Sequence, residues 1–275
     1  MSDQETTDTP EEEIEESSAP LLDHLIELRS RLIWSVAYII VAFGVCLVFA
    51  DPIYNFLAQP FVDVAIANGK EPTMIFTGLQ DKFFVNIRLS FYVALCVTFP
   101  MVAMQIWKFV APGLYNNERR AFLPFLLATP ILFTLGAAMA YYIVIPRAWG
   151  FFMSFEVGVA TEMAGALKDE AALQIQSLPA VKEYLGLTIL LMFAFALSFQ
   201  LPVLLLLLAK VGFVTADGLA GKRKYAIVGA FVFAMFMTPP DPLSQVLLAL
   251  PIIVLYEISI LIIRLTTKEP EEVDV

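Results

Sequence analysis

Residues 184–209 read YLGLTILLMFAFALSFQLPVLLLLLA and contain no Asp, Glu, Lys or Arg. A bilayer core about 30 Å thick is crossed by about 20 apolar residues in a helix, so this run is long enough to span a membrane. Runs of the same kind occupy residues 32–50, 83–107, 121–145 and 243–263, and a shorter one occupies residues 225–237. The sequence therefore predicts an all-α integral membrane protein with six transmembrane helices.

The fifth run is short because Pro239, Pro240 and Pro242 follow it closely. Its roughly 13 residues reach only about 20 Å at 1.5 Å per residue, which is less than the thickness of the membrane. Since proline cannot extend a helix, we expect a tight reversal between the fifth and sixth helices.

The overall composition excludes an ordinary soluble domain. Hydrophobic residues make up 59% of the 275 residues and charged residues only 16%, and the mean hydropathy is +0.76. A soluble domain is roughly half apolar and a quarter charged. A soluble fold of this length could not bury so much apolar surface.

The net charge of −10 arises largely at the two ends of the chain. Residues 1–20 hold eight acidic residues and no basic one, and residues 269–275 hold four more acidic residues. Such polar, acidic segments cannot bury a core of their own. We therefore predict disordered acidic tails over residues 1–20 and 268–275, which flank a six-helix membrane domain over residues 21–267.

The distribution of basic residues predicts the orientation of the chain in the membrane. An even number of spans places both termini on one side, and the cytoplasmic side carries the excess of Lys and Arg. Eleven basic residues fall on the side of the termini, whereas six are spread over the longer loops of the opposite side. We expect both termini to be cytoplasmic.

Enzymatic chemistry has little support in the sequence. The chain has a single histidine, His24, and lacks both a glycine-flanked serine nucleophile and a Walker-type glycine loop. We expect no metal, no cofactor and no bound nucleic acid. A small-molecule transporter is the other alternative, but it would need a charged or broken-helix site at the midplane, and preferably internal repeats, and neither is evident.

A few polar residues lie within or beside the spans, where burial is expensive. Gln200 lies in the fourth run, Asp241 and Gln245 lie at the reversal before the sixth, and Glu257 and Arg264 lie seven residues apart in the sixth. Gln200 has two interpretations, a functional contact or a simple hydrogen bond to a neighbouring helix. For Glu257 and Arg264 we expect an ordinary interfacial contact.

Two segments on the predicted cytoplasmic face place carboxylates among basic residues. In the first, residues 23–31, Glu27 and Arg31 have i, i+4 spacing on a helix that leads into the first span. In the second, residues 109–120, Glu118 precedes the third span. Each segment is open to two interpretations: a binding site, or a solvated ion pair in the first and a favourable helix-dipole contact in the second.

Three motifs resemble the TatC family, the receptor subunits of the twin-arginine protein translocase. They are His24-Leu25-Ile26-Glu27-Leu28-Arg29-Ser30-Arg31, then Ala111-Pro112-Gly113-Leu114-Tyr115-Asn116-Asn117-Glu118-Arg119-Arg120, then Thr238-Pro239-Pro240-Asp241-Pro242-Leu243-Ser244-Gln245. The motifs occur in the family's order, and the resemblance covers residues 21–264. It implies a glove-shaped bundle with short fifth and sixth helices.

The resemblance also implies a function. A TatC-like protein of the bacterial cytoplasmic (inner) membrane binds twin-arginine signal peptides. Together with the single-span subunits TatA and TatB it exports folded proteins, using the proton-motive force, as part of a multimeric receptor complex embedded in membrane lipids. By motif match, Glu27 and Glu118 accept the arginine pair, because forked guanidinium groups suit carboxylates. Residues that shape this patch are Arg29, Arg31, Phe109, Pro112, Tyr115 and Arg119.

One position departs from the family pattern. Within Ser198-Phe199-Gln200-Leu201-Pro202, relatives often carry a glutamate where this chain has Gln200. A neutral amide still supplies hydrogen bonds but removes any role that requires a carboxylate. By the same resemblance, Gln200, Gln245, Asp241 and Pro60 are expected to contact a partner helix.

Overall fold

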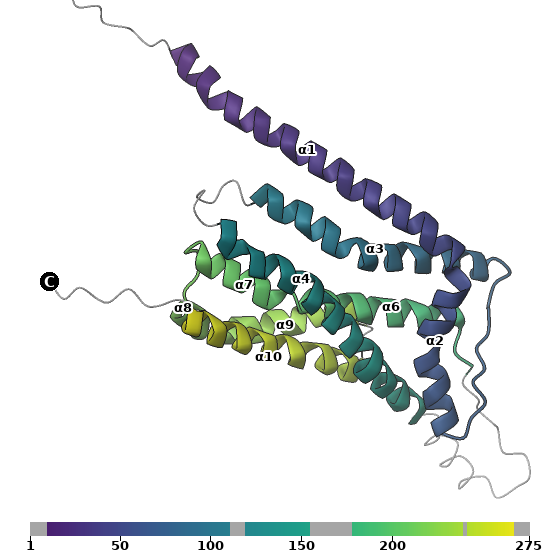
Figure 1. The fold of residues 1–275 in the computed structure, drawn as a ribbon. Coiled ribbons are helices and arrows are strands. Elements are labelled where there is room, and N and C mark those ends of the chain that lie inside the picture. The colour runs from purple at the N-terminus through teal and green to yellow at the C-terminus, as the bar shows by residue number, and fades with distance from the viewer. Residues whose placement is uncertain (1–9, 111–118, 155–177, 239–240, 267–275) are drawn as a thin grey trace, which may run out of the picture.

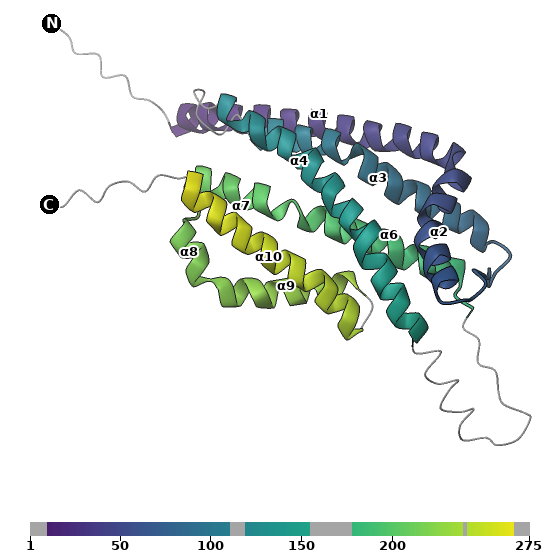
Figure 2. The same cartoon turned by 60° about the horizontal axis from the view of Figure 1, so that its bottom comes forward.

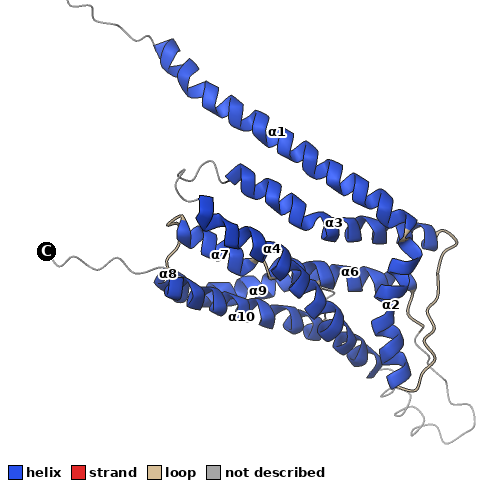
Figure 3. Cartoon of the chain, viewed as in Figure 1, coloured by secondary structure: helices blue, strands red, loops and turns tan. Residues whose placement is uncertain are grey.

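The computed structural model describes residues 10–110, 119–154, 178–238 and 241–266, and within these ranges the chain is almost entirely helical. Figure 1 shows the course of the chain, and Figure 3 shows that helices make up the described elements, with no strand among them. The elements, in chain order, are α1 (Pro10–Val48), α2 (Ala50–Ala67), α3 (Asp81–Val110), α4 (Arg119–Met139), the π-helix η3 (Ala140–Val144), α6 (Val181–Ser198), α7 (Leu201–Lys210), α8 (Ala216–Gly221), α9 (Arg223–Met237) and α10 (Pro242–Thr266).

Among the described residues, five stretches of helix are long and apolar enough to cross a membrane. They cover residues 24–48, 81–106, 124–154, 181–210 and 242–266. The predicted fifth span is α9, which has only 15 residues and ends at Met237, as the following prolines require. The structure therefore confirms a multi-span all-α fold with a short fifth helix, while the count of six spans stays a prediction.

The expectation of a short sixth helix is wrong. Helix α10 has 25 residues, from Pro242 to Thr266. Proline is tolerated in the first turn of a helix, so Pro242 starts α10 instead of shortening it, and the apolar run then continues through Pro251 to the last turn. At the other end of the chain, α1 begins at Pro10, so the boundary expected at residue 20 falls inside a helix.

The connection between the first two spans contains a helix, α2, that the apolar runs did not reveal. Pro60 lies inside α2 and is buried. Proline has no N–H, so it cannot donate to the Phe56 carbonyl four residues earlier. The Tyr141 hydroxyl, from η3, donates to this carbonyl at 2.7 Å, and the Tyr184 hydroxyl, from α6, donates to the neighbouring Leu57 carbonyl at 2.7 Å. These two bonds fasten α2 across the third and fourth spans at the end of the molecule away from the start of α1.

The interior consists of three apolar clusters. One joins η3, α6, α9 and α10 around Phe195 and Leu248, the second joins α2, α3 and α6 around Phe61 and Tyr184, and the third joins α7, α8 and α10. Helix α1 packs along α3 and lies at the edge of the bundle, as Figures 1 and 2 show. Its apolar span has the smallest buried share of the five, so most of its surface is left uncovered by the rest of the described chain.

Candidate functional site

The first candidate site lies where the N-terminal half of α1 meets the C-terminal end of α3. Arg31 donates from its Nε and its Nη2 to one oxygen of Glu27, Oε1, with the Nε contact at 3.0 Å. Arg31 Nη1 also reaches Gln105 Oε1 at 3.4 Å, and this contact ties the ion pair to α3. The i, i+4 pair expected from the sequence is therefore present, and Gln105 is a third member that sequence spacing could not reveal.

A stacked pair of rings lies one helical turn away from Glu27. Together with Glu27, Arg31 and Gln105, these two rings form what we call the Glu27 patch. The rings of His24 and Phe109 lie 4.2 Å apart between centroids with an interplanar angle of 17°. His24 Nδ1 is 3.9 Å from Glu27 Oε2, and the Glu27 side chain keeps 34% of its surface exposed. Within the described chain, no hydrogen bond reaches Oε2. Glu27 thus has one oxygen engaged by Arg31 and one open to a ligand.

The structure places only part of the predicted peptide-binding set. Arg29 is exposed on α1, and Phe109 lies against His24. Pro112, Tyr115 and Glu118 lie outside the described residues, and Arg119 starts α4 without a described side chain. The start of α4 and the end of α3 lie at the same end of the molecule as the N-terminal half of α1 (Figure 1).

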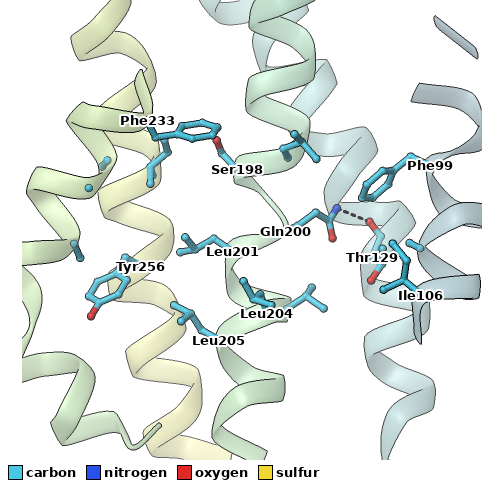
Figure 4. Close-up of a pocket in the computed structure, with 17 residues that line it drawn as sticks. Phe99, Ile106, Thr129, Ser198, Gln200, Leu201, Leu204, Leu205, Phe233 and Tyr256 are labelled. Carbon is cyan, nitrogen blue, oxygen red and sulfur yellow. Dashed lines mark hydrogen bonds between the residues drawn. The ribbon is translucent and has the colours of Figure 1, made fainter. Parts of the chain in front are cut away.

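The second candidate site is a cavity around a break in the fourth span. Helix α6 ends at Ser198 and α7 begins at Leu201, because Pro202 cannot donate to the Ser198 carbonyl. Gln200 lies in this break, and its Nε2 donates to the Thr129 carbonyl of α4 at 2.9 Å, as Figure 4 shows. A broken-helix site was not evident from the apolar run, but Pro202 predicts a bend in this span, and the structure shows the helix interrupted there.

This cavity has a volume of 550 Å³ and an almost wholly apolar wall. Few polar residues line it, and they include Thr129, Ser198, Gln200 and Tyr256. None of the described residues that line it is charged. A small charged solute would find no counter-ion here, so the cavity suits an apolar ligand or helix with a polar group placed to meet Gln200.

The turn between α9 and α10 holds the other polar residues singled out in the sequence. Asp241 caps α10, since its Oδ1 accepts from the Ser244 N–H at 2.7 Å. Among the described residues, its buried Oδ2 has no hydrogen-bond partner. Gln245 Nε2 contacts the Phe231 carbonyl at 3.3 Å. Neither Gln245 nor Pro60 lines the cavity around Gln200, so the structure does not gather these residues into one site.

Glu257 and Arg264 do not pair with each other. Glu257 accepts two bonds from Arg223, at 2.7 and 2.8 Å, and Arg264 donates to Asp217 at 2.8 Å. The Tyr256 hydroxyl also donates to the Leu219 carbonyl at 2.8 Å. These contacts fasten α8 and the start of α9 to α10, which is a structural role consistent with the interfacial contact expected from the sequence.

The sequence and the structure of this chain are both similar to those of known proteins of one family. The family model described as Sec-independent protein translocase protein (TatC) matches residues 23–251. The TatC protein of Magnetococcus marinus is 47% identical over 245 residues, covering 89% of this chain and 84% of the relative. The TatC protein of Escherichia coli K12 is 39% identical over 249 residues, with 90% of each chain covered. A crystal structure of the twin-arginine translocase receptor TatC superposes with a TM-score of 0.71 at 34% identity, covering 89% of this chain and all of that one.

Proposed function

The chain belongs to the TatC family of Sec-independent protein translocase proteins, and we propose that it is the receptor for signal peptides that carry two consecutive arginines. It is a multi-pass inner-membrane protein of the twin-arginine translocation system. In the proposed function it acts with TatA and TatB subunits in a multimeric complex and exports folded proteins at the expense of the proton-motive force.

The geometry of Glu27 is the observation that carries this proposal. Arg31 occupies one carboxylate oxygen, and this contact orients the half-buried Glu27 side chain, whose Oε2 has only His24 Nδ1 nearby, at 3.9 Å, among the described residues. An incoming guanidinium finds a preoriented acceptor there, and charge-assisted hydrogen bonds of this kind are roughly twice as strong as neutral ones. Glu118 is proposed as the second acceptor by motif match. A peptide with two arginines would engage both carboxylates.

The cavity around Gln200 supports a second part of the proposal, a contact with a partner helix. Its apolar wall and single uncharged amide fit a membrane-spanning segment that carries one polar side chain. Gln245 and Asp241 would form a separate contact at the turn before α10. Pro60, which is buried in α2, would act indirectly by shaping α2.

The test measures binding of a fluorescent signal peptide to the purified full-length protein in nanodiscs. The peptide carries two consecutive arginines, and a second version carries two lysines. We expect the wild-type protein to prefer the arginine peptide, because lysine cannot form the forked contact. Glu27→Gln should weaken binding of the arginine peptide about tenfold or more, as expected for the loss of a charge-assisted hydrogen bond of about 1.5–3 kcal/mol.

Asp217→Asn is the matched control. Asp217 is an exposed carboxylate on α8 at the same end of the molecule, and it contacts Arg264 instead of the patch. This variant should bind the arginine peptide like the wild type. Unchanged affinity in Glu27→Gln, or equal losses in both variants, would contradict the assigned site.

A further inference from the structure

A separate cavity lies between the outward halves of α3 and α6. It has a volume of 470 Å³, and its lining includes Asp81, Phe84, Arg88, Leu89, Lys182 and Gly186. None of its lining residues belongs to the cavity around Gln200. Figure 1 places the start of α3 and the start of α6 at the end of the molecule away from both the start of α1 and the end of α10. The cavity therefore faces the leaflet opposite the two termini.

Arg88 is the unusual residue of this cavity. It lies seven residues, or about 10 Å, into α3, inside an apolar span. In the part of the chain that the structure describes, no hydrogen bond or ion pair engages its guanidinium. A charged group at such a depth is expensive unless it finds a counter-charge or reaches the interface. Because helical side chains point toward the helix N-terminus, Arg88 extends from α3 toward the outward headgroup region.

Lys182 provides a second positive charge at the same cavity. It is the second residue of α6, and its side chain is exposed. The one carboxylate of the lining, Asp81, is already engaged, since its Oδ2 accepts bonds from Thr77 N, Thr77 Oγ1 and Gly78 N at 3.1, 2.8 and 2.7 Å. Asp81 keeps its negative charge and lies close enough to Lys182 to attract it, so the rim of the cavity carries one net positive charge, and Arg88 is the unpaired cation among its described residues.

The floor of the cavity is apolar, in contrast to its charged rim. Val85, Leu89, Leu185 and Ile189 line it, and Gly186 leaves open space, because a Cβ added there would have no atom within 4 Å. A free phosphate ion would make no use of an apolar floor. An amphiphile with an anionic head and a hydrocarbon chain matches both the rim and the floor.

We propose that this cavity binds an anionic phospholipid of the leaflet opposite the termini. The phosphate group lies at Arg88 and Lys182, and one acyl chain lies along α6 at Gly186. Forked guanidinium donors suit phosphate oxygens, and basic pockets between transmembrane helices bind anionic headgroups. The proposal depends only on the membrane location of the chain and is independent of signal-peptide binding.

The experiment uses native mass spectrometry of the detergent-purified full-length protein with phosphatidylglycerol, phosphatidylethanolamine or glycerol 3-phosphate. The wild type should retain phosphatidylglycerol in preference to the other two. Arg88→Gln should weaken this binding about tenfold or more. Gly186→Leu leaves both cations in place, its Cβ would meet no atom within 4 Å, and its longer side chain would occupy the path of the acyl chain, so it should also reduce lipid retention.

Two control variants match these changes. Arg147→Gln removes an exposed arginine whose guanidinium contacts the Ile143 carbonyl, outside the cavity. Gly44→Leu adds the same side chain to an exposed, unobstructed position of α1. Both should retain phosphatidylglycerol like the wild type.

Three results would overturn the proposal. The first is equal lipid retention by the wild type, Arg88→Gln and Gly186→Leu. The second is binding of glycerol 3-phosphate as tightly as the lipid, which would leave the apolar floor without a role. The third is unchanged lipid retention in Arg88→Gln together with loss of a co-purified partner subunit, which would make the cavity a site for a protein helix.

Discussion

Glu27 and Arg31 illustrate what the sequence can predict about a single residue. Their i, i+4 spacing predicts contact on one helix, and the structure confirms it. Gln105 is 74 residues away from Arg31, and no local pattern links the two. The same limit applies to Gln200, whose partner is a backbone carbonyl of α4. Local spacing predicts contacts within one helix, whereas contacts between helices depend on the packing of the whole bundle.

The first prediction concerns the hydrogen bond of Gln200. Its amide nitrogen must donate to the Thr129 carbonyl, and a carboxylate cannot do so. Gln200→Leu should lower the free energy of unfolding by about 0.6 kcal/mol, the average for a hydrogen bond between membrane helices. Gln200→Glu should lower it further at neutral pH, because an anion would then face a carbonyl oxygen in an apolar cavity.

Thermal unfolding in detergent at neutral pH and at about pH 5 measures this difference. The buried carboxyl of Gln200→Glu favours its protonated form, which regains a donor, so this variant should gain stability relative to Gln200→Leu as the pH falls. A Glu variant that loses stability relative to the Leu variant on acidification would contradict the assigned donor.

At the scale of the elements, apolar runs predict where helices cross the membrane but not where they break. The five long runs match the five candidate spans. The break at Gln200 and the π-helical turn at Tyr141 both fall inside those runs. The apolar runs also did not predict helix α2. Tyrosines from η3 and α6 donate to its carbonyls near Pro60, and such contacts between distant segments cannot be read from a local run. The apolar run over residues 243–263 predicts the length of α10 well, whereas the family pattern predicts a shorter sixth helix.

The second prediction concerns the crossing of α4 and α6 at Gly136. A Cβ added to Gly136 would lie 2.6 Å from the Phe195 carbonyl oxygen and 2.9 Å from the Ala196 Cα, both of which are backbone atoms. Gly136→Ala should therefore force the helices apart and lower the free energy of unfolding by about 1–3 kcal/mol, despite the better helix propensity of alanine.

Gly44→Ala is the control for this change. A Cβ at Gly44 would meet no atom within 4 Å, so this variant should be as stable as the wild type or slightly more stable. Thermal unfolding of the two variants in the same detergent compares them directly. Equal stability of both would show that α4 and α6 do not approach each other as closely as the structure indicates.

At the scale of the whole molecule, the two ends of the bundle carry different sites and contacts. The terminal side holds the Glu27 patch and the ion pairs of α8 and α10, and the opposite side holds α2 and the cavity at Arg88. The excess of basic residues on the terminal side predicts that this side is cytoplasmic, and this orientation stays a prediction. Of the disordered tails predicted for residues 1–20 and 268–275, residues 1–9 and 268–275 lie outside the described residues, whereas residues 10–20 belong to α1.

The third prediction tests this orientation. Asn68 ends α2 and is exposed, and Asp217 is exposed on α8 at the other end of the molecule. In a background without Cys46 and Cys96, an impermeant maleimide should label Asn68→Cys in intact spheroplasts and Asp217→Cys only after lysis. The reverse pattern would contradict cytoplasmic termini, and labelling of both sites before lysis would contradict a membrane-spanning arrangement.

The most direct test of the receptor function is site-specific photocrosslinking from Leu28, which is exposed one turn from both His24 and Arg31. A photoreactive side chain at this position should crosslink to a signal peptide with two arginines and much less to the same peptide with two lysines. The same probe at Val232, on the exposed face of α9, should crosslink to neither peptide. Absence of the arginine-dependent crosslink at Leu28, or an equal crosslink at Val232, would contradict recognition of the arginine pair by the Glu27 patch.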